Sequence, residues 1–407
     1  MEGIKYVIDE FSVENFRSIF KKQTIVFDSN IKAFYGANSS GKTNIYNAMS
    51  AFRQFIIHSA DPSSHGTPYT PFLLLEGASD VPSVFGIKFH GGEEFYEYSF
   101  SIDRDGVKEE EMYDLSSSRP RLIFKRSVGS TEGATRNGFH KKLFDGDGAV
   151  RNDSLLITLA HSTKNKYANA VFKAVRSINY VNLSRIDMFR ESAVVALQRK
   201  PELYGQLIKL FKDTDFSING ISYSISKFTP ESLAGVPLPE EVKKQLIDNG
   251  HNTIINTVHS VRNRDGDRVD TVMFDMNSQE SLGTNNFFVL AVIMLDIINE
   301  GETLYVDEFG ASTHTELCRF IVEFFKKASV KTGARLIINT HDIGLIKNGS
   351  IGVLDKNEIM IVEKDLLDET IVSPLKEKMR RNDENIGKKY VLGVYGGVPI
   401  LEEVNNG

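Results

Sequence analysis

A glycine-rich segment near the start of the chain has the residue types and spacing of a phosphate-binding loop. It runs from Gly36 to Thr43 as Gly-Ala-Asn-Ser-Ser-Gly-Lys-Thr and matches the pattern G-x-x-x-x-G-K-[S/T] at every fixed position. The glycines let backbone N–H groups converge on phosphate oxygens, Lys42 would bridge the β- and γ-phosphates, and the Thr43 hydroxyl would bind Mg²⁺. The residues expected to hold a nucleotide here are Gly36, Asn38, Ser39, Ser40, Gly41, Lys42, Thr43 and Asn44. A chance glycine-rich turn is the alternative, and the apolar run before the segment and the helical pattern after it weigh against that alternative.

Two adjacent carboxylates follow an apolar run far downstream. The run Leu304–Val306 ends in Asp307 and Glu308, as expected for a buried strand whose tip reaches a metal ion. Asp307 would hold the Mg²⁺ with its water shell, and Glu308 would act as the general base that activates an attacking water. Taken alone, the pair could end a strand in a solvated acidic turn. Together with a phosphate-binding loop, the catalytic interpretation is favoured.

A histidine stands after the next apolar run. Arg335–Ile338 is followed by the sequence Asn-Thr-His-Asp at 339–342. An imidazole N–H at the tip of a strand can donate a hydrogen bond to a γ-phosphate, so His341 is a third catalytic candidate beside Lys42 and Glu308. An ordinary polar surface histidine is the alternative.

A short turn of small polar residues opens an apolar helical pattern. Ser281, Gly283 and Thr284 precede the run that begins at Asn286. The free N–H groups at such a helix start and the Ser281 hydroxyl could hold a phosphate, in the same molecule or in another one. A plain helix cap is the alternative, because serine and threonine cap helices in proteins of every kind.

The elements that position these motifs alternate between strands and helices. Buried strands are predicted at 31–35, 303–306 and 335–339, and helices from Thr43 onward, at Asn286–Ile298 and at His314–Ala328. Such alternation is typical of a parallel sheet with helices on its faces, so the predicted fold class is α/β. Residues 84–102 alternate like two antiparallel strands, with a hairpin at His90–Gly92.

A long insertion lies between the two groups of motifs. Residues 117–153 are expected to form an exposed arm or loop, and residues 155–246 to be mainly helical with a strand at 218–225. A further strand is expected at 269–276. The predicted domains are a discontinuous head of residues 1–110 and 270–407 and an insertion of residues 111–269.

Composition and charge exclude several classes of protein. Of the 407 residues, 41% are apolar and 25% are charged, which is the balance of a globular chain and not of a disordered one. The net charge of −6 argues against a histone-like DNA binder, and a single cysteine, Cys318, excludes an intrachain disulfide and a cysteine-only zinc site. The longest apolar run, Phe287–Leu295, is too short to span a bilayer, and the N-terminus carries no apolar signal core. We therefore expect a cytoplasmic protein without a membrane partner.

The order of the motifs resembles that of the ABC-type ATPase heads shared by SMC and RecF-like proteins. It consists of an Asn-Phe-Arg-Ser segment, the phosphate-binding loop, a long insertion, Ser-x-Gly-Thr, Val-Asp-Glu and Thr-His-Asp. More narrowly, the chain is similar to the stand-alone bacterial ATPases of the AbiLi/RloA type, which are associated with abortive infection and phage defence. The narrower likeness rests on residues 280–284, 306–314 and 390–399, and the likeness as a whole covers residues 1–52 and 270–400.

The resemblance implies an ABC-type P-loop ATPase head with an N-terminal antiparallel β subdomain and a mixed, largely helical insertion. It implies ATP and Mg²⁺ as cofactors and a head-to-tail homodimer with two ATP molecules sandwiched at its interface, with a higher homo-oligomer as a further option. In that arrangement Ser281, Gly283 and Thr284 of one subunit contact the γ-phosphate held by the other. Arg17 matches the arginine that lies over the phosphates in RecF-like heads, and Ser312 and His314 fall where the family's D-loop crosses the interface.

The chain departs from the family pattern at several positions. Asn285 and Asn286 stand where the family often has arginines, Gly310 stands in place of an aspartate, and Thr315 in place of a proline. The stretch 69–75, where the family's Q-loop glutamine would be sought, contains no glutamine. We therefore expect hydrolysis to be slow or controlled by a partner.

Three functions are consistent with these features. The first is an ATP-hydrolysing, dimerising switch that senses phage infection and controls a separate toxin or nuclease, because the chain offers no second catalytic constellation. The second is a RecF/SMC-like DNA-binding ATPase of repair or recombination, and the third is a nucleotide-gated scaffold with little hydrolysis. The basic residues that could bind DNA are Arg119, Arg121, Lys125, Arg126, Lys376, Lys378, Arg380 and Arg381. The acidic clusters Asp355–Glu358 and Glu363–Asp365 are either metal ligands or, as the commoner case, solvated surface.

Overall fold

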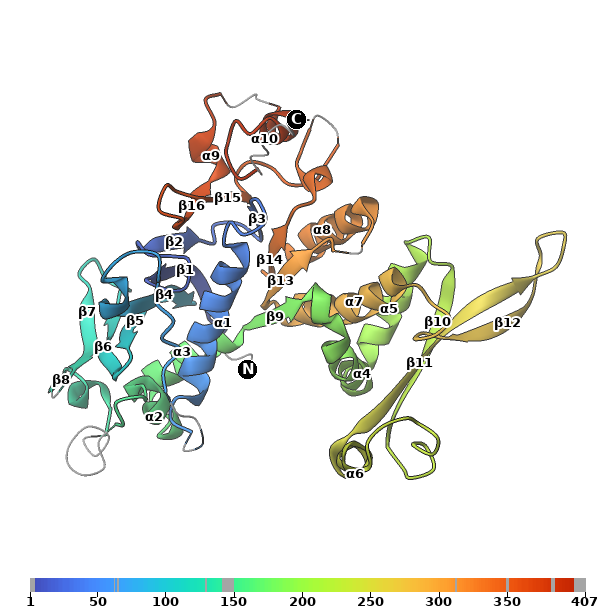
Figure 1. Ribbon diagram of the computed structural model, residues 1–407, viewed down its shortest axis with the longest axis horizontal. Coiled ribbons are helices and arrows are strands. Elements are labelled where there is room, and N and C mark those ends of the chain that lie inside the picture. The colour runs from blue at the N-terminus through green and yellow to red at the C-terminus, as the bar shows by residue number, and fades with distance from the viewer. Residues whose placement is uncertain are drawn as a thin grey trace, which may run out of the picture. The chain divides into compact units, whose positions relative to one another are not determined.

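The structure is a computed structural model that describes residues 4–61, 63, 66–128, 130–140, 150–311, 313–348, 351–381 and 385–398 (Figure 1). It forms two compact units, each assembled from segments far apart in the sequence. The first unit comprises residues 1–180, 302–309 and 335–407, and the second comprises residues 181–301 and 310–334. These units differ from the predicted division into head and insertion, because residues 111–180 join the N-terminal segment and residues 270–301 join the residues before them.

A six-stranded sheet carries the predicted motifs of the first unit. Its strands are β3 (Ile31–Tyr35), β9 (Ile178–Asn182), β13 (Thr303–Phe309), β14 (Arg335–Thr340), β15 (Ile359–Lys364) and β16 (Thr370–Pro374), in the order β16-β15-β3-β14-β13-β9. Strands β15, β3, β14 and β13 run parallel, and β16 pairs antiparallel with β15. Every residue of β3 is buried, as expected for a strand covered on both faces. The predicted parallel sheet is confirmed, and the carboxyl ends of β3, β14 and β13 meet at one edge.

The N-terminal part of this unit folds as a seven-stranded antiparallel sheet. Its strands are β1 (Val7–Glu14), β2 (Gln23–Val26), β4 (Ser83–Gly91), β5 (Glu94–Asp103), β6 (Gly106–Asp114), β7 (Arg121–Ser127) and β8 (Ser130–Glu132), in the order β2-β1-β4-β5-β6-β7-β8. The predicted hairpin is confirmed, since Gly91 pairs with Glu94 across the turn. The expectation of an exposed arm at 117–153 is wrong for β7, whose Ile123 and Phe124 are fully buried in the core. Residues 141–149 lie outside the described part of the chain.

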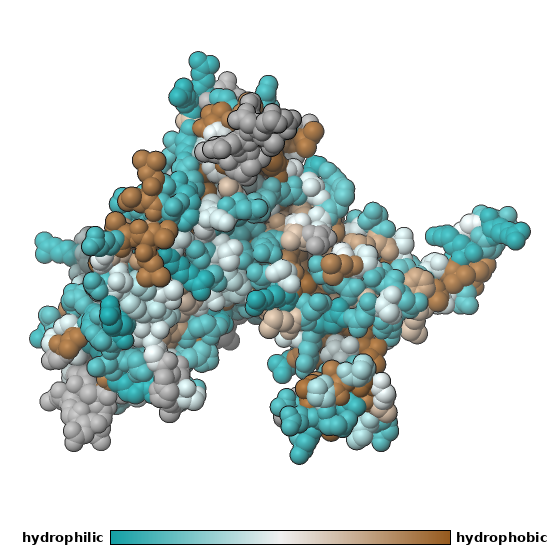
Figure 2. All heavy atoms as spheres, viewed as in Figure 1, coloured by the Kyte–Doolittle hydropathy of each residue, from teal (hydrophilic) through white to brown (hydrophobic). Residues whose placement is uncertain are grey.

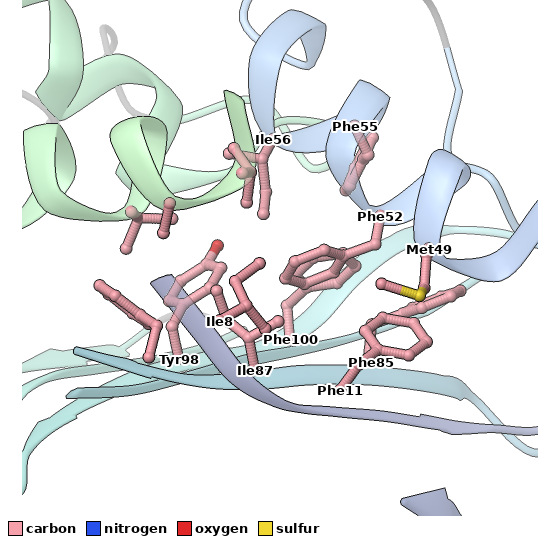
Figure 3. Packing of buried hydrophobic residues seen from close by; sticks show 14 of the residues in the cluster. Ile8, Phe11, Met49, Phe52, Phe55, Ile56, Phe85, Ile87, Tyr98 and Phe100 are labelled. Atoms are coloured by element: carbon pink, nitrogen blue, oxygen red, sulfur yellow. The ribbon is translucent and has the colours of Figure 1, made fainter. Parts of the chain in front are cut away.

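Helix α1 (Lys42–His58) shares one core with both sheets. Phe52 stacks on Phe100 of β5 with ring centroids 5.4 Å apart (Figure 3). Nearer the start of the helix, Tyr46 packs edge-on against Tyr305 of β13 at 5.2 Å. Burial of an aromatic side chain of this size stabilises the fold by roughly 1.5–3 kcal/mol. These contacts confirm the predicted helix and fix its first turn, which carries the end of the phosphate-binding loop.

Smaller elements complete the first unit. They are α2 (Leu156–Ser162), α3 (Lys166–Arg176), α9 (Leu375–Lys378), α10 (Ile386–Val391) and short 3₁₀ turns at Ala78–Asp80, Thr135–Asn137 and Ile343–Leu345. The Asn165 side chain caps α3 by accepting hydrogen bonds from two backbone N–H groups of its first turn. The apolar face of α3 joins the same core as α1.

The second unit is mainly helical and carries a three-stranded sheet. Its helices are α4 (Arg190–Arg199), α5 (Pro201–Lys212), α6 (Glu240–Asn249), α7 (Leu282–Glu300) and α8 (Thr315–Ser329), with a 3₁₀ segment at Leu183–Phe189. We call the antiparallel strands β10 (Ile218–Lys227), β11 (His251–Arg262) and β12 (Arg268–Asp275) the arm. Figure 1 shows them extending away from α4, α5 and α7, with α6 at one end. The predicted strands at 218–225 and 269–276 and the predicted helices at 286–298 and 314–328 are confirmed.

Helix α7 forms the centre of the second unit. By length and composition it could cross a membrane, but 72% of its most apolar window is buried within the structure. Phe287 of α7 packs edge-on against Phe211 of α5 with ring centroids 5.1 Å apart. The apolar length of α7 therefore serves packing. With this unit added, the predicted α/β head with an N-terminal antiparallel subdomain and a mixed, largely helical insertion is confirmed.

Candidate nucleotide-binding site

The phosphate-binding loop connects β3 to α1 in a conformation that two glycines permit. At Gly41, φ is 107°, and a Cβ there would lie 2.1 Å from the Thr370 hydroxyl. A Cβ at Gly36 would lie 2.3 Å from the carbonyl oxygen of Val362 in β15. Any side chain at either position would therefore push the loop away from the neighbouring backbone or hydroxyl.

Lys42 is held beneath the loop. Its Nζ donates hydrogen bonds to the carbonyl oxygens of Gly36 at 2.8 Å and Ala37 at 3.0 Å, and the residue is only 7% exposed. Burial lowers the pKa of Lys42 to about 8, and the Asp307 carboxylate opposes part of this shift. The ammonium is thus charged at neutral pH but close to its titration range.

The edge of the sheet beside Lys42 offers oxygen ligands. Asp307 is 1% exposed, and its Oδ1 lies 3.5 Å from the Thr43 hydroxyl oxygen. Asn339 Nδ2 donates to Asp307 Oδ1 at 2.7 Å and to the Lys42 carbonyl oxygen at 3.1 Å, while Tyr305 donates to Asn339 Oδ1 at 3.1 Å. A carboxylate and a hydroxyl of this kind fit Mg²⁺, which prefers oxygen ligands.

Glu308 and His341 stand at the ends of two neighbouring strands. The β13–β14 register shifts between Val306 and Phe309, and Glu308 has φ 57°, so the strand bulges where the two carboxylates occur. Partial desolvation, followed by the positive charge of Lys42, lowers the pKa of His341, which makes its imidazole neutral at pH 7. A neutral imidazole retains one N–H that can donate a hydrogen bond.

One pocket of about 290 Å³ in the first unit brings most of the predicted site residues together. It is lined by Asn38, Ser39, Gly41, Lys42, Thr43, Asn44, Asp307, Glu308, Asn339 and His341. Gly36 and Ser40 shape the loop from behind and do not line this pocket. Arg17 does not line it either: its side chain is exposed, with the guanidinium 5.5 Å from the centroid of the Phe16 ring. Binding of a phosphate by Arg17 therefore stays a prediction.

A hydroxyl network that the sequence does not reveal braces the loop. The Thr370 hydroxyl donates to the Ser40 carbonyl oxygen at 2.9 Å and lies 2.8 Å from the Ser18 hydroxyl. Asn44 Nδ2 in turn donates to Ser18 Oγ at 2.6 Å. The network thus joins β16, the Ser18 turn and the first turn of α1. Asn339 was also missed, although the polar Asn-Thr-His-Asp end of β14 is a signal that could have identified it.

We expect Thr370→Val to weaken both the fold and nucleotide binding. The change keeps the volume but leaves the buried Ser40 carbonyl without this donor, which costs about 1–3 kcal/mol of unfolding free energy. ATP affinity should fall several-fold because the loop loses its brace. Denaturant unfolding and ATP titration measure the two effects. Thr370→Ser keeps the hydroxyl and is the matched control; equal losses in both variants would contradict the assigned role.

The pKa of Lys42 predicts a pH dependence of ATP binding. The protonated ammonium attracts phosphate, so affinity should be nearly constant below pH 7 and fall as the pH rises through about 8. Well above that value the loss should approach tenfold per pH unit, as for release of one required proton. The Lys42→Arg variant stays charged over this range, so its affinity should not follow this profile. A flat profile for the unaltered protein would refute the assignment.

The Ser-x-Gly-Thr turn lies in the second unit, where it caps α7. Ser281 Oγ accepts a hydrogen bond from the Thr284 backbone N–H at 3.0 Å, so Ser281 does cap the helix. Contact of this turn with a phosphate stays a prediction. Ser281 and Gly283 also line a pocket of about 480 Å³ together with His314 at the start of α8. Ser312 lies outside the described residues.

Asn285 takes a structural role at a position where the family often has arginine. Its Nδ2 donates to the carbonyl oxygens of Met276 at 2.7 Å and Ser281 at 3.0 Å, and its Oδ1 accepts from Arg190 at 2.6 Å. The amide thus ties the turn to the segment before it and to α4. Asn285, which departs from the family pattern, thus holds the Ser281 turn in place.

A family model covers most of the chain. The family described as "AAA domain, putative AbiEii toxin, Type IV TA system" matches residues 31–347, which include the phosphate-binding loop, Asp307, Glu308 and His341. The chain belongs to this family. Its members carry the AAA domain, so the pocket described above is that of a P-loop ATPase family. A search of the curated proteins finds no match to the chain.

Solved structures similar to this chain include SMC heads and RecF. The SMC head bound to the C-winged-helix domain of ScpA is 14% identical, with 92% of this chain and 100% of that chain covered and a TM-score of 0.49. The SMC head domain from Thermotoga maritima is 15% identical, with 90% and 98% covered and a TM-score of 0.44. The recombination mediator RecF with ATP is 12% identical, with 91% and 99% covered and a TM-score of 0.38. With identities of 12–15% and TM-scores below 0.5, these likenesses do not bear on the role of this chain.

Proposed function

We propose that this chain binds and hydrolyses ATP and acts as a dimerising switch in a cytoplasmic anti-phage defence system, where it controls a separate toxin or nuclease. The observation that carries the proposal is the pocket of the first unit, where the phosphate-binding loop meets Asp307, Glu308 and His341. Family membership supports the ATPase part, and a family description that names a toxin–antitoxin system supports the defence part. The AbiLi/RloA type is proposed from the motifs alone.

Five residues of the pocket have a defined role in this proposal. The loop N–H groups and Lys42 hold the β- and γ-phosphates, and Thr43 and Asp307 hold Mg²⁺, which supplies charge neutralisation when bound. The Glu308 carboxylate accepts a proton from the attacking water. His341, being neutral, donates its N–H to a γ-phosphate oxygen.

The dimer is proposed because part of the predicted site lies in the second unit. Ser281, Gly283 and Thr284 would complete the pocket of a second copy, as the resemblance implies. Exposed apolar side chains on the first unit support a protein contact: Leu74 is 66% exposed and Leu366 is fully exposed. Figure 2 shows apolar atoms gathered on the side of the first unit where Figure 1 places β2 and β16.

The DNA-binding alternative is weakened by ion pairs. Ion pairs involve several of the candidate basic residues: Arg121 with Asp114, Lys125 with Glu111, Arg126 with Glu110 and Lys378 with Glu363. A cation that is already paired with a carboxylate neutralises fewer DNA phosphates and so releases fewer of the counterions bound to DNA. Its contribution to DNA affinity is therefore small. Binding of DNA that falls steeply with salt would restore this alternative.

The effector is proposed to be a separate chain. Within the described ranges, no group of three or more histidine, cysteine, aspartate or glutamate side chains could hold a metal ion. In the two acidic clusters, Glu358 accepts from the Asp355 N–H at 2.9 Å, and Glu363 pairs with Lys378. These carboxylates therefore serve local structure. Cleavage of DNA or RNA by the purified chain with Mg²⁺, lost on Asp355→Ala, would overturn the proposal of a separate effector.

Mixing two inactive variants tests the shared site. Lys42→Ala removes the phosphate lysine, and Ser281→Asp keeps the helix cap while placing a negative charge where a phosphate would bind. Each variant alone should lack ATPase activity. In an equimolar mixture, each mixed dimer carries one intact site, so about a quarter of full activity should return for a closed two-fold dimer whose subunits pair at random. No recovery would show that the site is not shared between subunits.

A phage challenge tests the biological part. Cells carrying the chain with its gene neighbours should survive infection as a population, and Lys42→Ala should remove the protection. Expression of the chain alone should leave growth unchanged, because the toxic activity is proposed to reside in the partner. Growth arrest by the chain alone would instead identify it as the toxin.

A further inference from the structure

Glu280, the residue just before the Ser281 turn, is held by the arm. Its Oε1 accepts a hydrogen bond from the Thr257 hydroxyl and lies 2.7 Å from His259 Nε2, and both of these residues belong to β11. Thr257 is fully buried, and the Glu280 side chain is 11% exposed. A single carboxylate oxygen thus joins two residues of the arm to the start of α7.

The segment between the arm and α7 is pinned at both ends. The Met276 N–H donates to the Ile255 carbonyl oxygen in β11 at 2.9 Å, and the Met276 carbonyl oxygen accepts from Asn285 in α7 at 2.7 Å. The His259 ring also packs on Phe274 of β12 with centroids 4.7 Å apart. Hydrogen bonds at Met276 and Glu280 thus tie this segment to β11, and the bond from Asn285 ties it to α7.

We propose that Glu280 is a positioning residue that makes the arm and the Ser281 turn move as one body, so that displacement of the arm changes the placement of Ser281 and Gly283. This inference rests on the proposed function, in which these two residues bind the γ-phosphate held by a second copy. The coupling is reciprocal: capture of the turn by ATP in a dimer must alter β11 and β12 to the same extent in free energy.

Steady-state kinetics gives the first test. Glu280→Ala should lower kcat by about 2- to 30-fold, the range of coupling effects from residues that do not touch ligand. The KM for ATP should stay unchanged, because the phosphate-binding loop belongs to the other unit. Glu280→Gln keeps an oxygen at the accepting position and should restore most of the activity. Asp270→Asn, on the exposed part of the same sheet, is the matched control and should behave as the unaltered protein.

Hydrogen exchange of backbone amides gives the second test. With Mg²⁺-ATP and the non-hydrolysing Glu308→Gln background, the amides of β11 and β12 should exchange more slowly when the dimer forms. Adding Glu280→Ala should remove this change in the arm while a dimer is still detected. Thr257→Val removes one donor to the same oxygen at constant volume, so it should also reduce the slowing of exchange in the arm. This variant replaces Glu280→Ala if that variant fails to fold.

The outcomes separate this inference from the function on which it rests. If the background variant dimerises with ATP but the arm amides do not respond, the coupling is disproved and the switch stands. Equal kcat in Glu280→Ala and the unaltered protein has the same meaning. If the unaltered protein neither hydrolyses ATP nor dimerises with it, the proposed function and the coupling both fail.

Discussion

Glu308→Gln should abolish turnover while leaving ATP bound. Loss of a general base typically costs about 10²- to 10⁴-fold in kcat. The amide has the same shape, so it keeps the bulged backbone at φ 57° and leaves Lys42, Thr43 and Asp307 in place. ATP affinity should therefore change little, and the dimer that normally dissociates after hydrolysis should accumulate. Phosphate release and size-exclusion chromatography with ATP measure the two effects.

The matched control for this change is Glu323→Gln. Glu323 lies on α8, is half-exposed and approaches Lys327 at 3.8 Å, outside the pocket. Its activity and its elution with ATP should equal those of the unaltered protein. If Glu308→Gln also leaves both unchanged, the chain is a nucleotide-gated scaffold and the ATPase proposal is wrong.

Lys42→Ala should remove nucleotide binding and every effect that depends on it. The ammonium is the charged group closest to the predicted phosphates, and charge-assisted hydrogen bonds of this kind contribute about 1.5–3 kcal/mol each. That range corresponds to about a 10- to 150-fold loss of ATP affinity. At ATP concentrations only just sufficient to saturate the unaltered protein, ATP-dependent dimerisation and hydrolysis should both fall strongly.

A second variant separates binding from folding. Lys42 is buried, and alanine would leave space beneath the loop and two carbonyl oxygens without this donor. Lys42→Met fills the space of the aliphatic stem without the charge. Both variants should lose ATP binding, and thermal unfolding should show Lys42→Met to be the less destabilised of the two. ATP binding retained by Lys42→Met would rule out the assigned role of the ammonium.

The sequence predicted the parts of the site that depend on local spacing. The loop from Gly36 to Thr43 carries its geometry within eight positions, and the strand ends at Asp307 and His341 follow from buried runs that stop at polar residues. Contacts between distant segments have no such local signal. The hydrogen bond from the Thr370 hydroxyl to the Ser40 carbonyl joins residues 330 positions apart. The sequence of neither segment indicates that the two meet.

The error at β7 has a different origin. The composition of 117–153, rich in serine, glycine and basic residues, favoured an exposed loop. The strand Arg121–Ser127 nevertheless contributes Ile123 and Phe124 to the core, because pairing with β6 turns alternate residues inward. A strand of seven residues is too short to change the overall polar composition of a segment of thirty-seven residues.

The discontinuity of the first unit has a consequence for synthesis on the ribosome. The phosphate-binding loop follows β3. The strands β14 and β15, which lie on either side of β3, and β13, which lies next to β14, can join the sheet only after residues 303–364 have left the ribosome. Pairing across such separations is slow to form, and a nascent chain grows at about 5–20 residues per second. The loop should therefore be unable to bind ATP until most of the chain, including residue 370, has been synthesised. A truncated translation product would carry the complete loop motif and still be inert as a switch.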